Sequence, residues 1–453
     1  MKILLINPPL TAEQRYGKDL AQFGPCSEPL GLAYVAGALE QAGHEVRIWD
    51  GQVERRTPWA PEAELIGITM NTPSYQVVKE MCIALKSEHS TIFHDIPIIL
   101  GGPHPTVMPE ETAKDIPEAD YIVAGEGERT DIWDMPSGTI AHTFPVKNLD
   151  DLPLPARHLL PMKQYQITAS RNKGHHAYTV IVARGCPFEC AFCCRLHGRK
   201  VRFHSVDRVI QEIELLVRDY DAKEINLEAD TITVNHKWMY GLCDALISSG
   251  LNHRISWTCE SRVDTVDENM LRYMKQAGCW QISYGVETGT QRLLDFIKKG
   301  ITLEQVRETF AITKKVGINV RAFFMLGIPT ETREESDATI QFARQLKAGW
   351  SQFTICVPFP GSSLYQWCLE NEPGRISGNW ADFRTHGGWG KGPLAYFPKA
   401  RTQAEMKALQ KEAYRRVYLR PSRVWSYLAK VRSLRQLWQG FKGAWVVAKT
   451  RWA

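Results

Sequence analysis

A chain of 453 residues is long enough for two or three domains with separate cores, and 44% hydrophobic with 23% charged residues is the balance of an ordinary globular protein. The amino terminus MKILLINPPL lacks a cleavage-site pattern, and no apolar run approaches the roughly 18 residues that cross a bilayer, so we exclude a signal peptide and a membrane span and expect a cytoplasmic protein. The net charge of +5 is carried by the carboxyl end, where 14 Lys and Arg stand against two acids from Lys399 onward.

Residues 1 to about 125 alternate short apolar runs with helical patterns. The runs KILLIN, LIGIT, IPIILGG and YIVAG predict strands, and LGLAYVAGALEQAG predicts a helix between two of them. Strict alternation with Gly or Pro at the joints is typical of βαβ units and a parallel sheet. Such sheets bind ligands beyond the carboxyl ends of their strands, which fall here near Asn7-Pro8-Pro9, Thr69-Met70-Asn71 and Gly101-Gly102-Pro103-His104.

A proline-rich stretch at 143–161 predicts an extended connector, and a second alternation follows it. Six apolar runs predict strands, and each is followed by a helical segment: AYTVIVAR, EINLEAD, RISWTCE, WQISYGVE, NVRAFFMLG and FTICVP. The clearest helices are expected at 206–219, 236–249, 268–277 and 333–346. Six strand–helix units predict most of a β/α barrel, whose chemistry lies in the loops after the strands.

The stretch RGCPFECAFCC, in the loop after the first barrel strand, contains four of the 11 cysteines, and these four span only nine residues. Cys186, Cys190 and Cys193 have the spacing C-x3-C-x2-C. Three thiolates on one turn can ligate three irons of a four-iron, four-sulfur cluster and leave the fourth iron open. A zinc site with His197 or Cys194 as fourth ligand is one alternative, although adjacent cysteines suit zinc poorly; a structural cluster and unbonded thiols are the others.

With Phe192 before its last cysteine, this motif resembles that of the radical S-adenosylmethionine (SAM) enzymes. The resemblance implies a 4Fe-4S cluster held by Cys186, Cys190 and Cys193, and SAM bound at the open iron and cleaved to a 5′-deoxyadenosyl radical. It also implies an electron donor such as flavodoxin or ferredoxin. Cys194 is expected to be a packed thiol, with a proton- or hydrogen-donor role as the alternative.

Residues at four later strand ends carry the same resemblance. EAD places Glu228 and Asp230 where the family holds the amino group of SAM, although the alanine between them departs from the paired aspartates of many relatives. After the next strands the resemblance assigns Arg262 to a carboxylate, Glu287 to the ribose and Gly327 to the adenine. Each acid alone is explained equally well as a helix N-cap or solvated loop residue, but their common place on one barrel face favours a cofactor site.

The stretches PLGLAYVAGALEQAGHEVRIWDG, GGPHPT and GEGE resemble the cobalamin-binding domain that precedes the barrel in a large radical SAM subfamily. The resemblance implies that Asn7, Pro8, Gly101 and Gly102 lie at a bound cobalamin (B12). No D-x-H-x-x-G motif marks a lower axial histidine. His104 is the nearest candidate, but a loop histidine bonded to backbone is favoured. A Rossmann-like domain without cofactor is the alternative.

We therefore predict an α/β protein with a Rossmann-like (flavodoxin-like) cobalamin-binding domain at 1–135, a Pro-rich linker at 136–172, a partial (β/α)6 TIM-type barrel at 173–365 and a helical basic region at 366–453. The resemblance implies an enzyme that methylates an unactivated carbon of a small or lipid-like substrate. An oxidative cyclase or rearrangement enzyme with the same cofactors is the first alternative, and a non-catalytic cobalamin or Fe-S sensor is the second.

The basic tail begins with a capping box, Thr402-Gln403-Ala404-Glu405, that predicts a helix over 402–419. Beyond Glu412 there is no acid, and four tryptophans alternate with Lys and Arg. A basic, tryptophan-rich segment predicts peripheral contact with the inner membrane face. Packing of the same segment on the barrel is the equally weighted alternative, and no nucleic-acid partner is expected.

Overall fold

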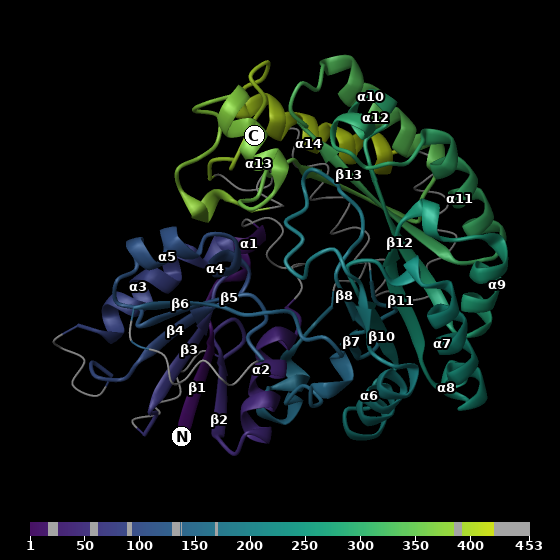
Figure 1. Ribbon diagram of the computed structural model, residues 1–453. Coiled ribbons are helices and arrows are strands. Elements are labelled where there is room, and N and C mark those ends of the chain that lie inside the picture. The colour runs from purple at the N-terminus through teal and green to yellow at the C-terminus, as the bar shows by residue number, and fades with distance from the viewer. Residues whose placement is uncertain are drawn as a thin grey trace.

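The computed structural model describes residues 1–16, 26–54, 62–87, 93–128, 136, 138–167, 171–384 and 392–420. These residues contain two parallel sheets of six strands each, the first at the left and the second at the right of Figure 1. The predicted α/β class is therefore confirmed, with a Rossmann-like sheet ahead of a partial barrel and a helical region after it.

The first sheet has the strand order β2-β1-β3-β4-β5-β6, all parallel. Side chains of β1 alternate between its two faces: Ile3 and Leu5 share a core with α2 (Leu30–Gln41), while Leu4 and Ile6 share another with α3 (Tyr75–Leu85). Both faces are therefore covered, as a parallel sheet requires. The strands are β1 Lys2–Asn7, β2 Glu45–Asp50, β3 Leu65–Thr69, β4 Ile98–Gly101, β5 Tyr121–Ala124 and β6 Thr139–His142. The shorter helices are α1 Ala12–Tyr16, α4 Pro103–Val107 and α5 Pro109–Asp115.

The predicted linker, which was to begin at 136, includes strand β6. This strand pairs with β5 from Tyr121↔Thr139 to Ala124↔His142 and belongs to the first sheet. Its four residues are too few to show a strand period in the sequence. The rest of the connector contains three short 3-10 turns: η3 Leu149–Asp151, η4 Arg157–Leu159 and η5 Met162–Gln164.

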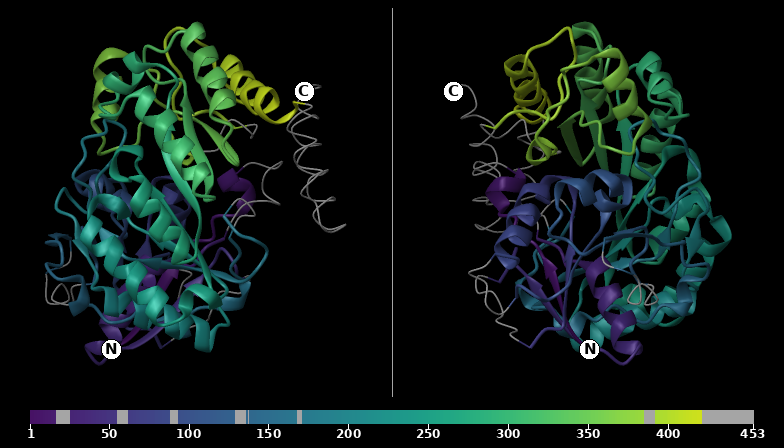
Figure 2. Two further views of the ribbon diagram at one scale, coloured as in Figure 1. Left: turned by 90° about the vertical axis from the view of Figure 1, so that its right-hand side faces the viewer. Right: turned by 60° about the vertical axis from the view of Figure 1, so that its left-hand side comes forward.

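The second sheet has the strand order β14-β13-β12-β11-β10-β7, again all parallel. Figure 2, left, turns toward the viewer the helices that cover its outer face. The strands are β7 Ala177–Ile181, β10 Glu224–Glu228, β11 Ser256–Ser261, β12 Cys279–Glu287, β13 Asn319–Leu326 and β14 Trp350–Ile355. The helices are α6 Val206–Asp219, α7 His236–Ser248, α8 Leu251–Arg254, α9 Glu268–Gln276, α10 Gln291–Phe296, α11 Leu303–Lys315, α12 Arg333–Leu346, α13 Ser363–Asn371 and α14 Gln403–Tyr418. A short antiparallel pair, β8 Ala183–Arg184 with β9 Arg202–Phe203, follows β7.

Helix α6 shows how local sequence determines these boundaries. Ser205 is its N-cap and accepts a hydrogen bond from Arg208 N, as the sequence predicts. Val209, Ile213 and Leu216, three or four residues apart, are buried on one face. The predicted spans 206–219 and 333–346 agree with α6 and α12 at both ends.

The second sheet does not close into a full barrel, so β7 and β14 are its edge strands. Side chains from other elements cover both edges. At β7, Thr179 N donates to Glu28 Oε1 at 3.2 Å and Thr179 O accepts from Arg157 Nη2 at 2.6 Å. Arg157 also forms ion pairs with Glu28 and Glu212, at 3.3 and 2.6 Å. An acid of the first domain and an arginine of the connector thus replace the missing neighbour strand.

Helix α14 covers the other edge, at β14. Ser351 N donates to Tyr418 Oη at 2.7 Å, and Phe353 N donates to Tyr414 Oη at 3.2 Å. The predicted capping box is present, with Thr402 Oγ1 accepting from Glu405 N. The helix predicted over 402–419 is confirmed and serves to close the barrel edge.

In the described part of the chain, no helix is long and apolar enough to cross a membrane. Residues 421–453 lie outside the described residues, so the predicted membrane contact of the tail stays a prediction.

Candidate active site between the two sheets

The cysteine loop, residues 185–198, leaves the barrel after β8. Gly185 has φ +95°, and a Cβ there would run into the carbonyl oxygen of Lys200, so the turn requires glycine. Gly185 N donates to Asp230 Oδ2 at 2.6 Å, and Cys186 N donates to Gly198 O at 3.1 Å. The loop is therefore closed at its base and tied to the end of β10.

The three predicted ligands have different surroundings within the loop. Cys186 Sγ lies 3.3 Å from Thr231 Oγ1, Cys190 Sγ accepts from Arg262 Nη1 at 3.6 Å, and Cys193 is exposed. Among the described residues, no three His, Cys, Asp or Glu side chains converge closely enough to hold one metal ion. A four-iron cluster takes its thiolates on separate irons, so its ligands need not converge in that way.

Cys194 has a partner outside the loop. Its thiol donates to Pro360 O at 3.3 Å, and burial raises its pKa to about 11. The thiol is therefore protonated near neutral pH, which agrees with the expectation of a packed side chain.

A cavity of about 550 Å³ lies between the carboxyl ends of the two sets of strands. The first domain supplies glycines and apolar side chains to it, and the barrel side supplies charged ones. The first wall contains Leu5, Gly31, Leu32, Val35, Gly67, Ile68, Thr69, Ile99, Gly101, Gly102, Pro103, Thr106, Val123, Gly125, Gly127 and Glu128. The second contains Arg171, Ile181, Ala183, Arg184, Leu196, His197, Glu228, Ala229, Asp230 and Glu260.

Of the residues predicted at a cobalamin, Gly101 and Gly102 line this cavity, but Asn7, Pro8 and His104 do not. Asn7 is buried and donates to Asp50 Oδ1 at 2.8 Å, so its side chain joins the carboxyl ends of β1 and β2.

The structure contradicts both predicted roles of His104, as a ligand at cobalamin and as a loop histidine bonded to backbone. His104 lies in α4, fully buried, with Nδ1 3.1 Å from Thr72 Oγ1, and its ring packs edge-on against Tyr75 and Trp380. Its imidazole therefore pairs with a hydroxyl group, not with backbone, and lies outside the cavity. Burial lowers the pKa of His104 to about 4, so the ring is neutral.

Of the predicted SAM-binding residues, Glu228 and Asp230 line the cavity. Sequence reasoning missed Arg171, which lies between two carboxylates of the same wall: its guanidinium is 3.3 Å from Glu228 Oε1 and 3.8 Å from Glu260 Oε1. No motif marks an arginine in the connector, so only the fold brings it to the strand ends.

Arg262 and Glu287 are not among the residues that line the cavity. Glu287 has φ +69° and forms a buried ion pair with Lys299 at 2.6 Å. Arg262 forms an ion pair with Asp264 at 2.9 Å. Their predicted contacts with SAM stay predictions, and the structure assigns each an internal partner.

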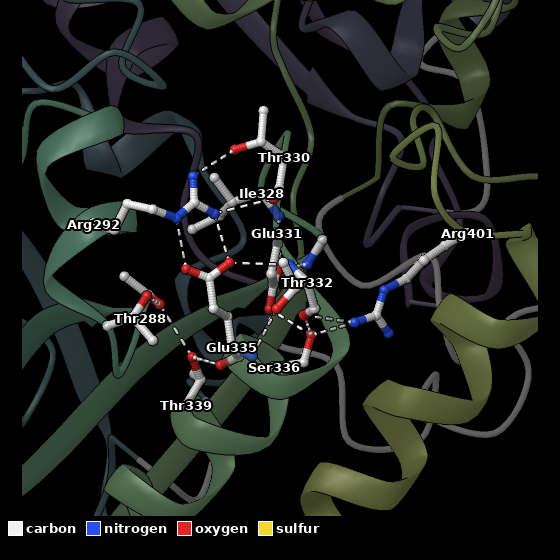
Figure 3. A network of polar contacts seen from close by, with 12 residues as sticks. Thr288, Arg292, Ile328, Thr330, Glu331, Thr332, Glu335, Ser336, Thr339 and Arg401 are labelled. Atoms are coloured by element: carbon white, nitrogen blue, oxygen red, sulfur yellow. Dashed lines mark hydrogen bonds and ion pairs between the residues drawn. The ribbon is translucent and has the colours of Figure 1, made fainter.

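Gly327 begins a turn that is held by the buried carboxylate of Glu331, and Figure 3 shows this carboxylate with Ser336 and Arg401. Gly327 has φ +77°, and both Gly327 N and Ile328 N donate to Glu331 Oε2. Ser336 Oγ donates to the other oxygen of Glu331 at 2.7 Å and accepts from Arg401 Nη2 at 2.6 Å. Burial raises the pKa of Glu331 to about 7. This network fixes the backbone of the predicted adenine-binding turn.

A buried ion network joins the GEGE segment of the first domain to the base of the cysteine loop. Glu126 accepts two hydrogen bonds from Arg202, from Nη2 at 2.5 Å and from Nη1 at 3.0 Å, and it lies 3.3 Å from His197 Nδ1. Arg184 Nη2 donates to Glu128 at 2.5 Å. Burial alone would raise the pKa of Glu126, but the hydrogen bonds from His197 and Arg202 outweigh it and hold the pKa far below its ordinary value. The ionised network docks the two walls against each other.

Two family models match the chain: residues 18–132 match the B12 binding domain, and residues 180–343 match the radical SAM superfamily. An uncharacterized methyltransferase of Pyrococcus horikoshii is 34% identical over 453 residues, which cover 93% of each chain. An anaerobic magnesium-protoporphyrin IX monomethyl ester cyclase of Rubrivivax gelatinosus is 28% identical over 405 residues, which cover 81% of this chain and 70% of that protein.

A solved structure shares the fold. It is that of TsrM, a radical SAM methyltransferase from Kitasatospora setae with cobalamin and a [4Fe-4S] cluster bound, and it aligns with a TM-score of 0.65 and 16% identity over 93% of this chain and 89% of that one. Both family models, the full-length relative and the two-sheet architecture agree, and the chain belongs to the radical SAM superfamily, in the group that carries a B12-binding domain ahead of the radical SAM domain.

Proposed function

We propose that the protein is a cobalamin-dependent radical SAM C-methyltransferase that acts on an unactivated carbon of a small or lipid-like substrate. The observation that carries the proposal is the shared cavity: the glycine-rich strand ends of the B12-binding domain and the base of the cysteine loop face each other across one space. A substrate in that space would contact both cofactors. The names of the Pyrococcus relative and of TsrM support methyl transfer as the outcome.

The residues present fit a 4Fe-4S cluster. Cys186, Cys190 and Cys193 would hold three irons, because thiolates are the ligands that iron–sulfur clusters take. Glu228 and Asp230 would hold the amino group of SAM, and the turn at Gly327 would present backbone to its adenine. When bound, the cluster, SAM and cobalamin supply the radical and the methyl group.

The first wall also leaves space for a large ligand. A Cβ at Gly31 would meet no atom within 4 Å, so glycine leaves space on the cavity side of α2. His197 is the one histidine on the described cavity wall, and it comes from the cysteine loop. The first wall would hold cobalamin through residues among which, in the described part of the wall, there is no histidine.

The protein's own task is to orient and to exclude water. The ion network of Glu126 and Glu128 with Arg184 and Arg202 holds the two walls at a fixed distance, and the apolar first wall keeps water from the reacting carbon. Arg171 would neutralise the carboxylates of Glu228 and Glu260 until SAM arrives.

Two partners complete the proposal. The exposed side of the loop at Cys193 gives an electron donor such as flavodoxin or ferredoxin a short path to the cluster. The tail beyond Arg420 would contact the inner membrane face. Binding of anionic vesicles by the full chain, and its loss in a chain ending at Arg420, is the expected result; equal binding by both would contradict the membrane contact.

The proposed activity is tested with the full chain, reconstituted anaerobically with iron, sulfide and hydroxocobalamin and then given a reductant and SAM whose methyl carries deuterium. Formation of 5′-deoxyadenosine together with deuterated methyl on cobalamin and S-adenosylhomocysteine is expected. Formation of 5′-deoxyadenosine without any deuterated methyl transfer would contradict methyl transfer, and no 5′-deoxyadenosine would contradict the enzyme itself.

A further inference from the structure

Arg262, directly after β11, contacts the cysteine loop at two of its residues. Its Nη1 donates to Cys190 Sγ at 3.6 Å, and its guanidinium lies over the ring of Phe188, 3.7 Å from the ring centre. Phe188 is two residues before Cys190 in the loop. The guanidinium therefore contacts both the thiol of Cys190 and the ring of Phe188 in the same loop.

The other donors of Arg262 fix the direction of the guanidinium. Nε and Nη2 each donate to one oxygen of Asp264 at 2.9 Å, and Nη2 also donates to Lys299 O at 2.7 Å. The residue is only 7% exposed. A planar fork held at three acceptors cannot turn toward another ligand without breaking buried, charge-assisted hydrogen bonds.

We propose that Arg262 adjusts the reduction potential of the cluster through Cys190. Hydrogen bonds and charges next to the ligating sulfurs change the potential of iron–sulfur clusters. A reduced cluster carries one more negative charge, so a fixed cation with an N–H on one thiolate stabilises the reduced form and raises the potential. Arg262 is thus a positioning and tuning residue, a role different from direct contact with SAM.

This inference rests on the proposed function, since Cys190 must be a cluster ligand. The variants are Arg262→Gln, which removes the charge, and Arg262→Lys, which keeps the charge but loses the planar fork. Arg272→Gln is the matched control, because Arg272 also forms an arginine–carboxylate pair, with Glu268, but lies on the surface of α9. The measurement is an EPR-monitored redox titration of the reconstituted full chain, with iron content determined on the same samples.

We expect Arg262→Gln to shift the reduction equilibrium about tenfold toward the oxidised cluster, which is about 59 mV to more negative potential for one electron. Arg262→Lys should give an intermediate potential, and Arg272→Gln should leave it unchanged. An Arg262→Gln variant with full iron content and the wild-type potential would overturn the inference. If that variant holds no iron, Arg262→Lys decides: a lowered potential supports the inference and an unchanged one overturns it.

The two failures are distinguishable. A wild-type chain that binds no cluster contradicts the proposed function, and the inference falls with it. A wild-type cluster whose potential does not respond to Arg262 contradicts the inference alone.

Discussion

The two walls of the cavity are both made of parallel strand ends, yet they differ in chemistry. The first wall offers glycines, apolar side chains and two threonines with a single acid, Glu128, whereas the second offers Arg171, Arg184, His197 and three carboxylates. An apolar, glycine-lined wall suits a large ring that is held by shape, and a charged wall suits a small zwitterion that is held by ion pairs. We therefore expect variants of the first wall to affect cobalamin, and variants on the barrel side to affect the cluster and SAM.

Replacing a predicted cluster ligand in the cysteine loop should give the largest effect. Cys190→Ala is expected to abolish 5′-deoxyadenosine formation, because a cluster with two remaining thiolates is not held at the reactive position. Cobalamin binding, followed by its visible absorption after gel filtration, should persist. Cys194→Ala is the matched control and should retain the cluster, because Cys194 only donates to Pro360 O. Cleavage of SAM by Cys190→Ala would contradict the ligand assignment.

A variant that fills the first wall should lose cobalamin and keep the cluster. Gly31→Phe places a ring where a Cβ meets no atom within 4 Å, so it should lower cobalamin retention at least about tenfold, a change of about 1.4 kcal/mol. Iron content should stay at the wild-type value. Gly378→Phe, at another glycine with open space but outside the cavity, is the control. Loss of iron together with cobalamin would show that the walls are not independent.

Breaking the contact between the walls should affect stability. Glu126→Gln removes the charge that pairs with buried Arg202, and an uncompensated buried charge costs about 3–5 kcal/mol. We expect a lower thermal midpoint. Glu304→Gln breaks an exposed pair with Arg307 and should change the midpoint little. Equal midpoints for both variants would argue against a docking role for Glu126.

The last prediction concerns the pH dependence of stability and the turn at Gly327. Burial raises the pKa of Glu331 to about 7 from its unfolded value of 4.5, so the folded state keeps a proton that the unfolded state loses between these values. Stability contributed by this group is therefore present below pH 4.5 and is lost as pH rises toward 7, by at most roughly 3 kcal/mol. Glu331→Gln should flatten that fall in thermal melts from about pH 4 to pH 8, which bracket the two pKa values. An unchanged slope would contradict the buried, protonated state.

Much of the fold was predictable because the periods are strong. The apolar face of α6, its N-cap Ser205 and the capping box at Thr402 are local signals, and the structure confirms them. Strand β6 was missed because four residues show no period. The edge coverage of β7 by Glu28 and Arg157 joins residues 129 apart in the chain, so no local pattern reveals it.

The candidate site was predictable in part for a similar reason. Cys186, Cys190 and Cys193 lie in one short loop, so their spacing carries the prediction. Arg171 and Glu126 reach the site only through tertiary packing, and sequence reasoning missed them. His104 was misplaced because a histidine in a glycine-rich loop resembles a ligand until the aromatic cage of Tyr75 and Trp380 is known.

One cavity between the two sheets is expected to bring the cluster and cobalamin together. The most direct measurement is EPR of the doubly loaded full chain, with the cluster reduced and cobalamin in its paramagnetic Co(II) state. Each signal should be broader and relax faster than in chains loaded with one cofactor alone, and Gly31→Phe should restore the isolated cluster signal. Two independent, unperturbed signals in a chain that holds both cofactors would contradict it.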